Sequence, residues 1–140
     1  MTRAGDIMHT GTECVDEHDT LADAARIMRE RDVGALPICG KDQKLLGILT
    51  DRDIVLKCVA EGRDPGEVTA GEMAEGRPMV IEDDEDTDQV LRVMEQYRVR
   101  RLPVINHPDH KLVGMISEAD IARGLPQARL AEFVTAICAR

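Results

Sequence analysis

The stretch that decides the fold is Gly47-Ile48-Leu49-Thr50-Asp51-Arg52-Asp53-Ile54, and the chain contains it twice. The second copy is Gly114-Met115-Ile116-Ser117-Glu118-Ala119-Asp120-Ile121. Each copy consists of a glycine, two apolar residues, a hydroxyl residue, two variable residues, an acid and an isoleucine. The apolar run predicts a buried strand, and the hydroxyl residue is a favourable N-cap for a helix that starts directly after it. We call these strand-to-helix junctions the first corner (residues 50–53) and the second corner (residues 117–120).

The repetition extends over most of the chain. Ala35-Leu36-Pro37-Ile38 returns as Arg101-Leu102-Pro103-Val104 at an interval of 66 residues, from Pro37 to Pro103. The interval becomes 67, from Gly47 to Gly114, because the second polar hairpin is one residue longer. Self-similarity at a fixed interval indicates a repeated structural unit.

Equivalent elements are expected in the two halves. In each half the sequence predicts a short lead-in segment (6–8 and 72–74), a brief strand (12–15 and 78–81), an amphipathic helix (21–31 and 87–98), two strands joined by a hairpin, and the corner helix. The order β-α-β-β-α, twice, predicts an α/β protein built from two subdomains. We place them at residues 1–66 and 67–124, with a linker at residues 63–66 and a C-terminal amphipathic helix within residues 125–140.

The composition restricts the possible partners. A net charge of −9 argues against binding to a nucleic-acid backbone, which needs a broad basic surface. Aromatic residues make up only 1% of the chain, so base stacking is not expected and the core has to be aliphatic. No apolar run has the length of a membrane span, and the N-terminus does not read as a secretory signal. We therefore expect a cytoplasmic protein that binds neither nucleic acid nor membrane.

The corners carry residues suited to a nucleotide. Unpaired backbone N–H groups at a helix N-terminus favour a phosphate, and the hydroxyl of Thr50 or Ser117 would add a donor. Asp53 and Asp120 follow these hydroxyls by three residues on the same helix face, where a carboxylate can accept hydrogen bonds from a vicinal diol such as ribose. Arg52 would add positive charge at the first corner only. The alternative is that each hydroxyl and acid form a capping box and serve only to start the helix.

Taken in order, these motifs resemble a tandem pair of cystathionine-β-synthase (CBS) domains, a Bateman module. The resemblance covers about residues 3–124. It implies two β-α-β-β-α subdomains related by a pseudo-twofold, with their sheets packed face to face in one disc. The chain is particularly similar to small stand-alone CBS-pair proteins, so any regulation would act in trans on a separate protein partner.

The resemblance also implies a ligand of the adenosine type (AMP, ADP, ATP or S-adenosylmethionine) in clefts between the halves, with no required cofactor. The phosphate and ribose contacts of the family carry over to Thr50 with Asp53, and to Ser117 with Asp120. The adenine would lie near residues of the adjoining strands, which are Ala35, Pro37, Arg101 and Pro103. Arg101 has an alternative role as a surface charge on its strand.

Many members of the family form dimers, and a homodimer is expected here. The candidate contact surfaces are the apolar residues of the corner helices, which are Ile54, Val55, Cys58, Val59 and Ile121. The alternative is that these residues belong to the core of the chain itself.

The cysteines leave a further alternative open. Cys14 and Cys39 end the first and second strands, so their sulfurs could reach bonding distance if those strands are neighbours, whereas in a reducing cytosol both would stay thiols. No C-x-x-C motif indicates a zinc ribbon, and no nucleophile–base pair or Gly-rich phosphate loop indicates an enzyme. The leading hypothesis is a non-enzymatic sensor without a metal. The alternatives are a ligand-free dimeric interaction module and a thiol-redox module using Cys14 and Cys39.

Overall fold

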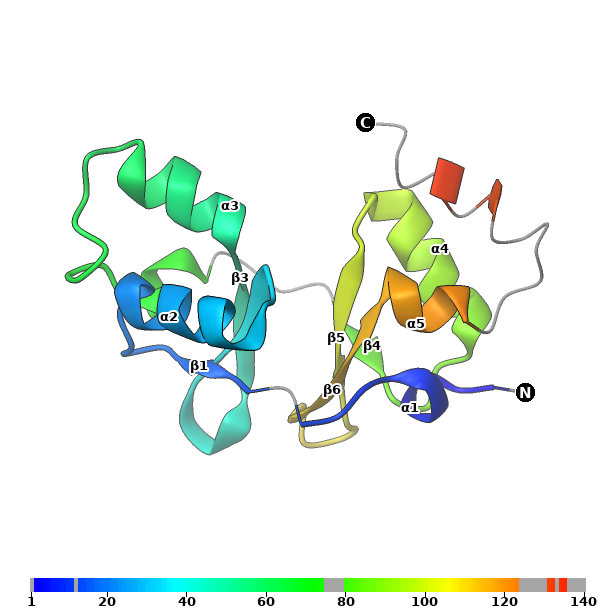
Figure 1. Cartoon of the computed structure of the whole chain (residues 1–140). Coiled ribbons are helices and arrows are strands. Elements are labelled where there is room, and N and C mark those ends of the chain that lie inside the picture. The colour runs from blue at the N-terminus through cyan, green and yellow to red at the C-terminus, as the bar shows by residue number, and fades with distance from the viewer. Residues whose placement is uncertain (1, 12, 75–79, 124–130, 133, 136–140) are drawn as a thin grey trace. The chain divides into compact units, whose positions relative to one another are not determined.

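The computed structural model describes residues 2–11, 13–74, 80–123, 131–132 and 134–135. The chain divides into two compact units (Figure 1). The middle unit is formed by residues 13–78, and the split unit is formed by residues 1–12 together with residues 79–140. No helix in the described part of the chain combines the length and apolar character needed to span a membrane.

The middle unit contains a three-stranded sheet with the order β1-β2-β3. Strand β1 (Val15–Asp16) is parallel to β2 (Ala35–Cys39), and β2 is antiparallel to β3 (Leu45–Thr50). Helix α2 (Leu21–Arg31) connects β1 to β2, a 3-10 turn (Lys41–Gln43) lies in the hairpin, and α3 (Asp51–Ile54) continues as a π-helix (Val55–Val59). A second 3-10 turn, η3 (Ala70–Met73), packs against β1 and β3.

The split unit repeats this arrangement, with the sheet order β4-β5-β6 and the same strand directions. Its elements are α1 (Ala4–Ile7), β4 (Ile81–Glu82), α4 (Thr87–Tyr97), β5 (Arg101–Ile105), β6 (Leu112–Ser117) and α5 (Glu118–Ala122). The predicted α/β fold with two equivalent β-α-β-β-α sets is therefore confirmed. The brief first strands differ from the prediction. Each is two residues long and starts later than the sequence predicted. The expected C-terminal helix falls mostly outside the described residues, of which 131–132 and 134–135 are helical.

The units cut across the sequence halves because the lead-in segments are exchanged. The amide of Gly5, in α1, donates to the carbonyl of Asp83 at 2.9 Å, although Asp83 follows β4 in the second half. The amide of Gly71, in η3, donates in the same way to the carbonyl of Glu17 at 2.9 Å in the first half. Figure 1 shows α1 beside the sheet of the split unit, where it contacts β4 and β6. Each sheet is thus packed against a segment from the other half of the sequence.

The exchanged segments explain the glycine that begins each corner motif. A Cβ on Gly47 would lie 3.2 Å from the Ala74 Cα. A Cβ on Gly114 would lie 2.6 Å from the Met8 Sδ and 2.8 Å from the carbonyl oxygen of His9. The backbone of the lead-in segment passes directly over the glycine of the corner strand, and a side chain there would push it away.

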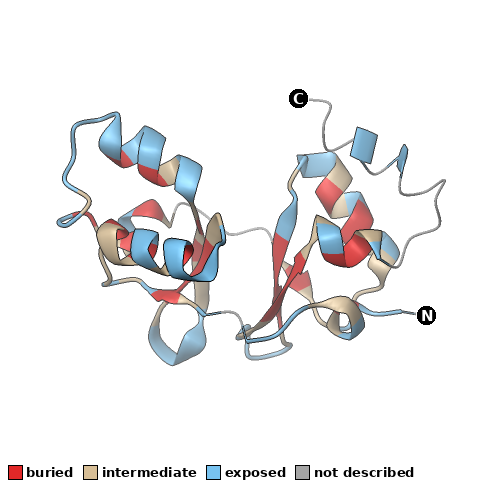
Figure 2. Cartoon of the chain, viewed as in Figure 1, coloured by how far each residue is buried: buried red, intermediate tan, exposed pale blue. Residues whose placement is uncertain are grey.

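Each unit has its own aliphatic core (Figure 2). One face of each amphipathic helix turns inward, with Leu21, Ala24 and Met28 of α2 buried in the middle unit. Val90, Leu91 and Met94 of α4 are buried in the split unit. Burial of such side chains is the dominant stabilising contribution to a fold of this size, at about 1.5–3 kcal/mol for each large aliphatic residue.

The apolar residues of the corner helices divide between the two roles that the sequence left open. Ile54, Cys58 and Ile121 are buried in the cores of their own units. Val55 and Val59 are exposed, to 54% and 58% respectively. The prediction of a contact surface is therefore wrong for the three buried residues, which take the alternative role because they pack into the cores of their own units.

A substitution at the corner glycines tests the close approach. Gly114→Ala should lower the free energy of unfolding by about 2 kcal/mol, because the new methyl group meets the backbone of His9 as well as the Met8 side chain. Urea unfolding followed by circular dichroism measures the change. Gly47→Ala should lower the free energy of unfolding by less, because the nearest contact of its new Cβ is longer. Gly66 is exposed, so Gly66→Ala provides the control. Equal stability of all three variants would contradict the proposed packing.

Candidate functional site

The first corner is a capped helix start with one carboxylate oxygen left over. Thr50 ends β3, and its Oγ1 accepts a hydrogen bond from the amide of Asp53 at 3.0 Å. The Asp53 Oδ2 accepts in return from the amide of Thr50 at 3.0 Å. The other oxygen, Oδ1, lies 3.5 Å from the Lys57 Nζ, and the Asp53 side chain is 25% exposed. The capping box and a ligand contact are therefore compatible, because they use different oxygens.

The second corner has the same capping box but a more crowded carboxylate. The Asp120 Oδ2 accepts from the amide of Ser117 at 2.9 Å, from the Ser117 hydroxyl at 3.1 Å and from the His9 Nδ1 at 2.8 Å. The Asp120 Oδ1 pairs with the guanidinium of Arg123. The Asp120 side chain is only 5% exposed. Burial would raise the pKa of Asp120, but the hydrogen bonds from Ser117 and His9 together outweigh burial and hold this pKa below its usual value.

The backbone amides of the corners are less available than the sequence predicted. The amide of Asp51 donates to the carbonyl of Gly34 at 3.0 Å, and the amide of Arg52 donates to the Asp51 Oδ1 at 2.8 Å. At the second corner, the amide of Glu118 donates to the carbonyl of Arg100 at 2.9 Å. These amides already have partners, so the corner side chains become the stronger candidates for contact with a ligand.

The residues expected around an adenine lie on the strand beside each corner strand. Ala35 pairs with Thr50, and Arg101 pairs with Ser117, so both stand at the level of a corner hydroxyl. Two residues further on, Pro37 and Pro103 are buried. The fold thus brings each of these residues close to a corner within its own unit.

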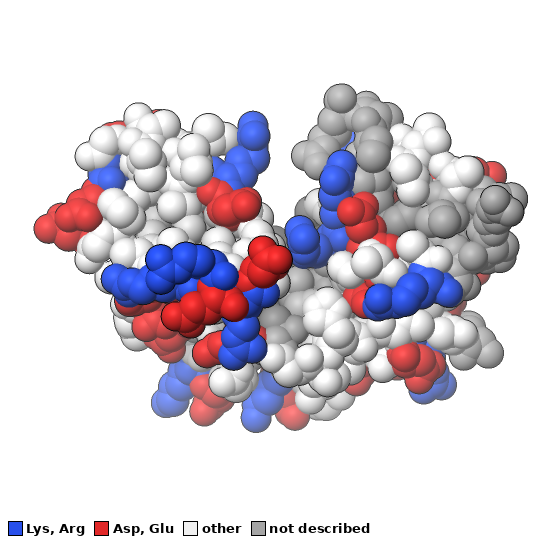
Figure 3. Space-filling view, in the orientation of Figure 1, with Lys and Arg blue, Asp and Glu red and all other residues white. Residues whose placement is uncertain are grey.

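The two arginines predicted near the corners reach into solvent. The side chains of both Arg52 and Arg101 are exposed. On the face that Figure 3 shows, basic and acidic side chains alternate, with acidic residues lying beside the basic ones over α2. Neither arginine is held in place by burial, so each would have to be recruited by a bound anion.

The sequence did not indicate His9 or Arg123 as site residues. The contact between His9 and Asp120 joins residues that are 111 positions apart, and it depends on the exchange of the lead-in segments. The backbone of His9 pairs with Met115 in β6, with N–O distances of 2.9 and 3.0 Å, and this pairing holds the imidazole over the corner. The i,i+3 spacing from Asp120 to Arg123 was the available signal for the second contact.

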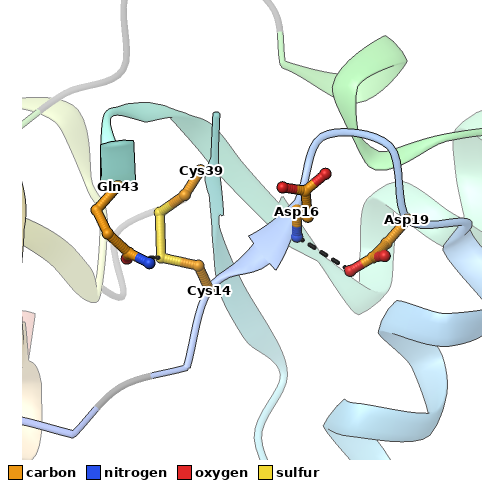
Figure 4. The surroundings of a disulfide bond; sticks show 5 residues. All are labelled: Cys14, Asp16, Asp19, Cys39 and Gln43. Atoms are coloured by element: carbon orange, nitrogen blue, oxygen red, sulfur yellow. Dashed lines mark hydrogen bonds between the residues drawn. A yellow bond between two sulfur atoms is a disulfide. The ribbon is translucent and has the colours of Figure 1, made fainter. Parts of the chain in front are cut away.

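Cys14 and Cys39 form a disulfide bond in the structure (Figure 4). Their Cα atoms are 5.7 Å apart, because Cys14 directly precedes β1 and Cys39 ends the neighbouring β2. The bond closes a loop with a sequence separation of 25, which corresponds to about 3 kcal/mol in the chain-entropy description. It lies at the end of β2 remote from Ala35 and the first corner, at a distance of about 13 Å along the strand.

The lowered pKa of Asp120 predicts a pH-dependent contribution to stability. A carboxylate whose pKa is depressed by folding stabilises the protein above its unfolded pKa of about 3.9, and this contribution is lost as the pH falls through the folded value. Asp120→Asn should therefore lower the stability at pH 7 by about 2 kcal/mol and flatten the acid limb below about pH 4. Urea unfolding between pH 3 and 7 measures both effects.

The matched control for this experiment is Asp84→Asn, which removes an exposed carboxylate from a loop of the same unit. It should leave both the stability at pH 7 and the shape of the acid limb close to those of the wild type. If Asp120→Asn behaved like Asp84→Asn, the hydrogen-bonded role of Asp120 would be refuted.

Comparison with known proteins agrees with this architecture. Residues 4–59 and 70–127 each match the CBS domain family. The chain is 53% identical over 138 residues to hypoxic response protein 1 of Mycobacterium tuberculosis (strain CDC 1551 / Oshkosh), covering 99% of this chain and 95% of that protein. It is 35% identical over 127 residues to the CBS domain-containing protein YhcV of Bacillus subtilis (strain 168), covering 87% and 84% of the two chains.

Solved structures show the same fold. The crystal structure of Hypoxic Response Protein I with two coordinated zinc ions matches with a TM-score of 0.82 at 54% identity, covering 89% of this chain and all of that one. The CBS domain pair of protein MJ0100, in complex with 5′-methylthioadenosine and S-adenosyl-L-methionine, matches with a TM-score of 0.71 at 27% identity, covering 88% and 94%. With two matched segments that together make up most of its length, the chain belongs to the CBS domain family.

Proposed function

We propose that this protein is a non-enzymatic regulatory module that binds an adenosine-type ligand through the hydroxyl and the acid of a corner. The observation that carries the proposal is which oxygens of the Asp53 carboxylate already have partners. Its Oδ2 completes the cap of α3, while its Oδ1 contacts only Lys57 among the described residues. A carboxylate has about four acceptor positions, so Asp53 keeps the capacity to accept both hydroxyls of a ribose diol.

The ribose, rather than a phosphate, is the proposed centre of recognition. The amides of Asp51 and Arg52 already have partners, which leaves the Thr50 hydroxyl and the Arg52 side chain as phosphate donors. The ligands of MJ0100, 5′-methylthioadenosine and S-adenosyl-L-methionine, share an adenosine group and have no phosphate. AMP, ADP and ATP contain the same group, so one acceptor at Asp53 serves all of them.

One similar protein of known structure, Hypoxic Response Protein I, has two coordinated zinc ions. Among the described residues of this chain, no three His, Cys, Asp or Glu side chains come together in a way that would hold a metal ion. The disulfide between Cys14 and Cys39 remains available for a redox response, and its distance from the first corner separates that chemistry from ligand binding.

Binding of AMP, ADP, ATP and S-adenosylmethionine tests the proposal. At 100 times its dissociation constant, a ligand should add about 2.7 kcal/mol to the stability of the wild type. Asp53→Asn should abolish this gain, because an amide oxygen can still cap the helix whereas the amide nitrogen cannot accept from a diol. Thermal unfolding with and without each ligand is the measurement, and no shift with any of them would refute the adenosine-type ligand.

The control for this test is a second capping box with the same local chemistry. Thr20 and Asp23 cap α2 through the same reciprocal pair of hydrogen bonds, with distances of 3.1 and 3.2 Å. Asp23→Asn should leave the ligand-dependent shift intact. A loss of the shift in both variants would show that stability, rather than a ligand contact, was being measured.

An exposed apolar surface supports the proposed homodimer. Val55, Leu56 and Val59 lie on the helix that continues the first corner, and all three are exposed. Large apolar side chains that gather on one exposed helix mark a docking surface. We infer that this surface pairs with a second copy of the chain or with a protein partner that is regulated in trans.

The oligomeric state tests this surface. Val55→Asp/Val59→Asp should sediment as a monomer at concentrations at which the wild type is a dimer, because burying two carboxylates opposes association. Sedimentation velocity over a concentration series gives both states. A monomeric wild type, or a dimer that the two substitutions leave unchanged, would contradict the proposed surface.

A further inference from the structure

The two corners share one sequence pattern, but their carboxylates are in different states. Asp120 receives three hydrogen bonds at Oδ2 and the guanidinium of Arg123 at Oδ1, which fills the acceptor positions of a carboxylate. Asp53 receives one amide hydrogen bond at Oδ2 and the longer contact from Lys57 at Oδ1. Only Asp53 can accept a diol without first losing a partner.

The donors that fill the second corner have no counterparts in the first half. At the interval of 66 residues, the position of His9 corresponds to Glu75, and at the interval of 67, Arg123 corresponds to Leu56. An ionised glutamate and a leucine have no side-chain donor for a carboxylate. The residues that make the two corners different therefore lie outside the repeated motif.

We propose that His9 and Arg123 act as built-in occupants of the second corner, so that the chain takes one adenosine-type ligand, at the first corner. This inference rests on the proposed function. Both occupants are more than half exposed at the side chain, while Asp120 beneath them is buried. With both partners in place, the Asp120 side chain is only 5% exposed, so little of this carboxylate is open to a ligand.

His9 and Arg123 compete well with a free ligand for the Asp120 carboxylate, because the fold holds both side chains in place. The backbone of His9 is paired on both sides with Met115, and Arg123 lies one helical turn after Asp120. A donor in the same chain acts at a high effective concentration, so a free ligand at micromolar or millimolar levels is at a disadvantage. A ribose diol that displaced them would also leave the guanidinium of Arg123 without its carboxylate.

Titration calorimetry with AMP tests the inference. The wild type should bind one AMP per chain, Asp53→Asn should bind none, and His9→Ala/Arg123→Ala should bind two. Leu56→Arg introduces a guanidinium at the position that corresponds to Arg123, so it should weaken AMP binding at the first corner about tenfold. A wild type that binds two AMP per chain, or whose single AMP is lost in Asp120→Asn but not in Asp53→Asn, would overturn the inference.

A matched control comes from the capping box of α2. Arg26 pairs with Asp23 at 2.7 Å with the same i,i+3 spacing that joins Arg123 to Asp120. His18→Ala/Arg26→Ala therefore removes the same two residue types from the first half, and it should leave the stoichiometry at one. A change in stoichiometry in this control would show that loss of charge alone explains the result.

A ligand-free measurement separates this inference from the proposed function. In a double-mutant cycle of His9→Ala and Asp120→Asn, the losses in urea midpoint should not add, because the two residues are in direct contact. Additive losses would overturn the role of His9 as an occupant, whatever AMP does. A cycle with coupling, combined with no AMP binding in any variant, would refute the proposed function and with it the ligand number.

Discussion

The close passage of the lead-in segments over the corner glycines is the constraint on which the structure depends. Gly114 admits the backbone of His9 at a distance that a side chain would not allow without a shift, and Gly47 admits Ala74 at a distance that is tight for a side chain. This approach lets each sheet accept a segment from the other half of the sequence. The same passage delivers His9 to the second corner, so packing and the chemistry of the site have a common origin.

The corners show how a helix cap and a ligand contact can share one residue. A carboxylate at the third helical position uses one oxygen to close the capping box, and the second oxygen is left for another purpose. In the first half that oxygen of Asp53 has Lys57 at 3.5 Å, and the Asp53 side chain is 25% exposed. In the second half the oxygen of Asp120 pairs with Arg123. Both copies of the motif therefore form the cap, while the remaining carboxylate oxygen has a different partner in each half.

The corner helix of the first half has a similar division of roles. Ile54 and Cys58 are four residues apart and turn into the core, whereas Val55 and Val59, also four apart, turn outward. Helical spacing puts each pair on one face, so a short segment supplies both a core contact and an exposed apolar surface. The proposed dimer contact is thus continuous with the first corner along the chain.

The sequence by itself determined the repeat, the element order and the positions of the longer helices and strands, because apolar periodicity and the hydroxyl-to-acid spacing are local signals. The two brief first strands start later than it predicted. It also indicated that Cys14 and Cys39 could meet if the first two strands are neighbours, which they are, although Cys14 directly precedes β1 and does not end it. Only the tertiary structure decided which carboxylate oxygens are occupied and which apolar residues of the corner helices are exposed. The contact of His9 with Asp120 spans 111 residues and needs the lead-in segment to cross Gly114. No local pattern encodes such a contact, because it arises from the pairing of backbone segments that are distant in the chain.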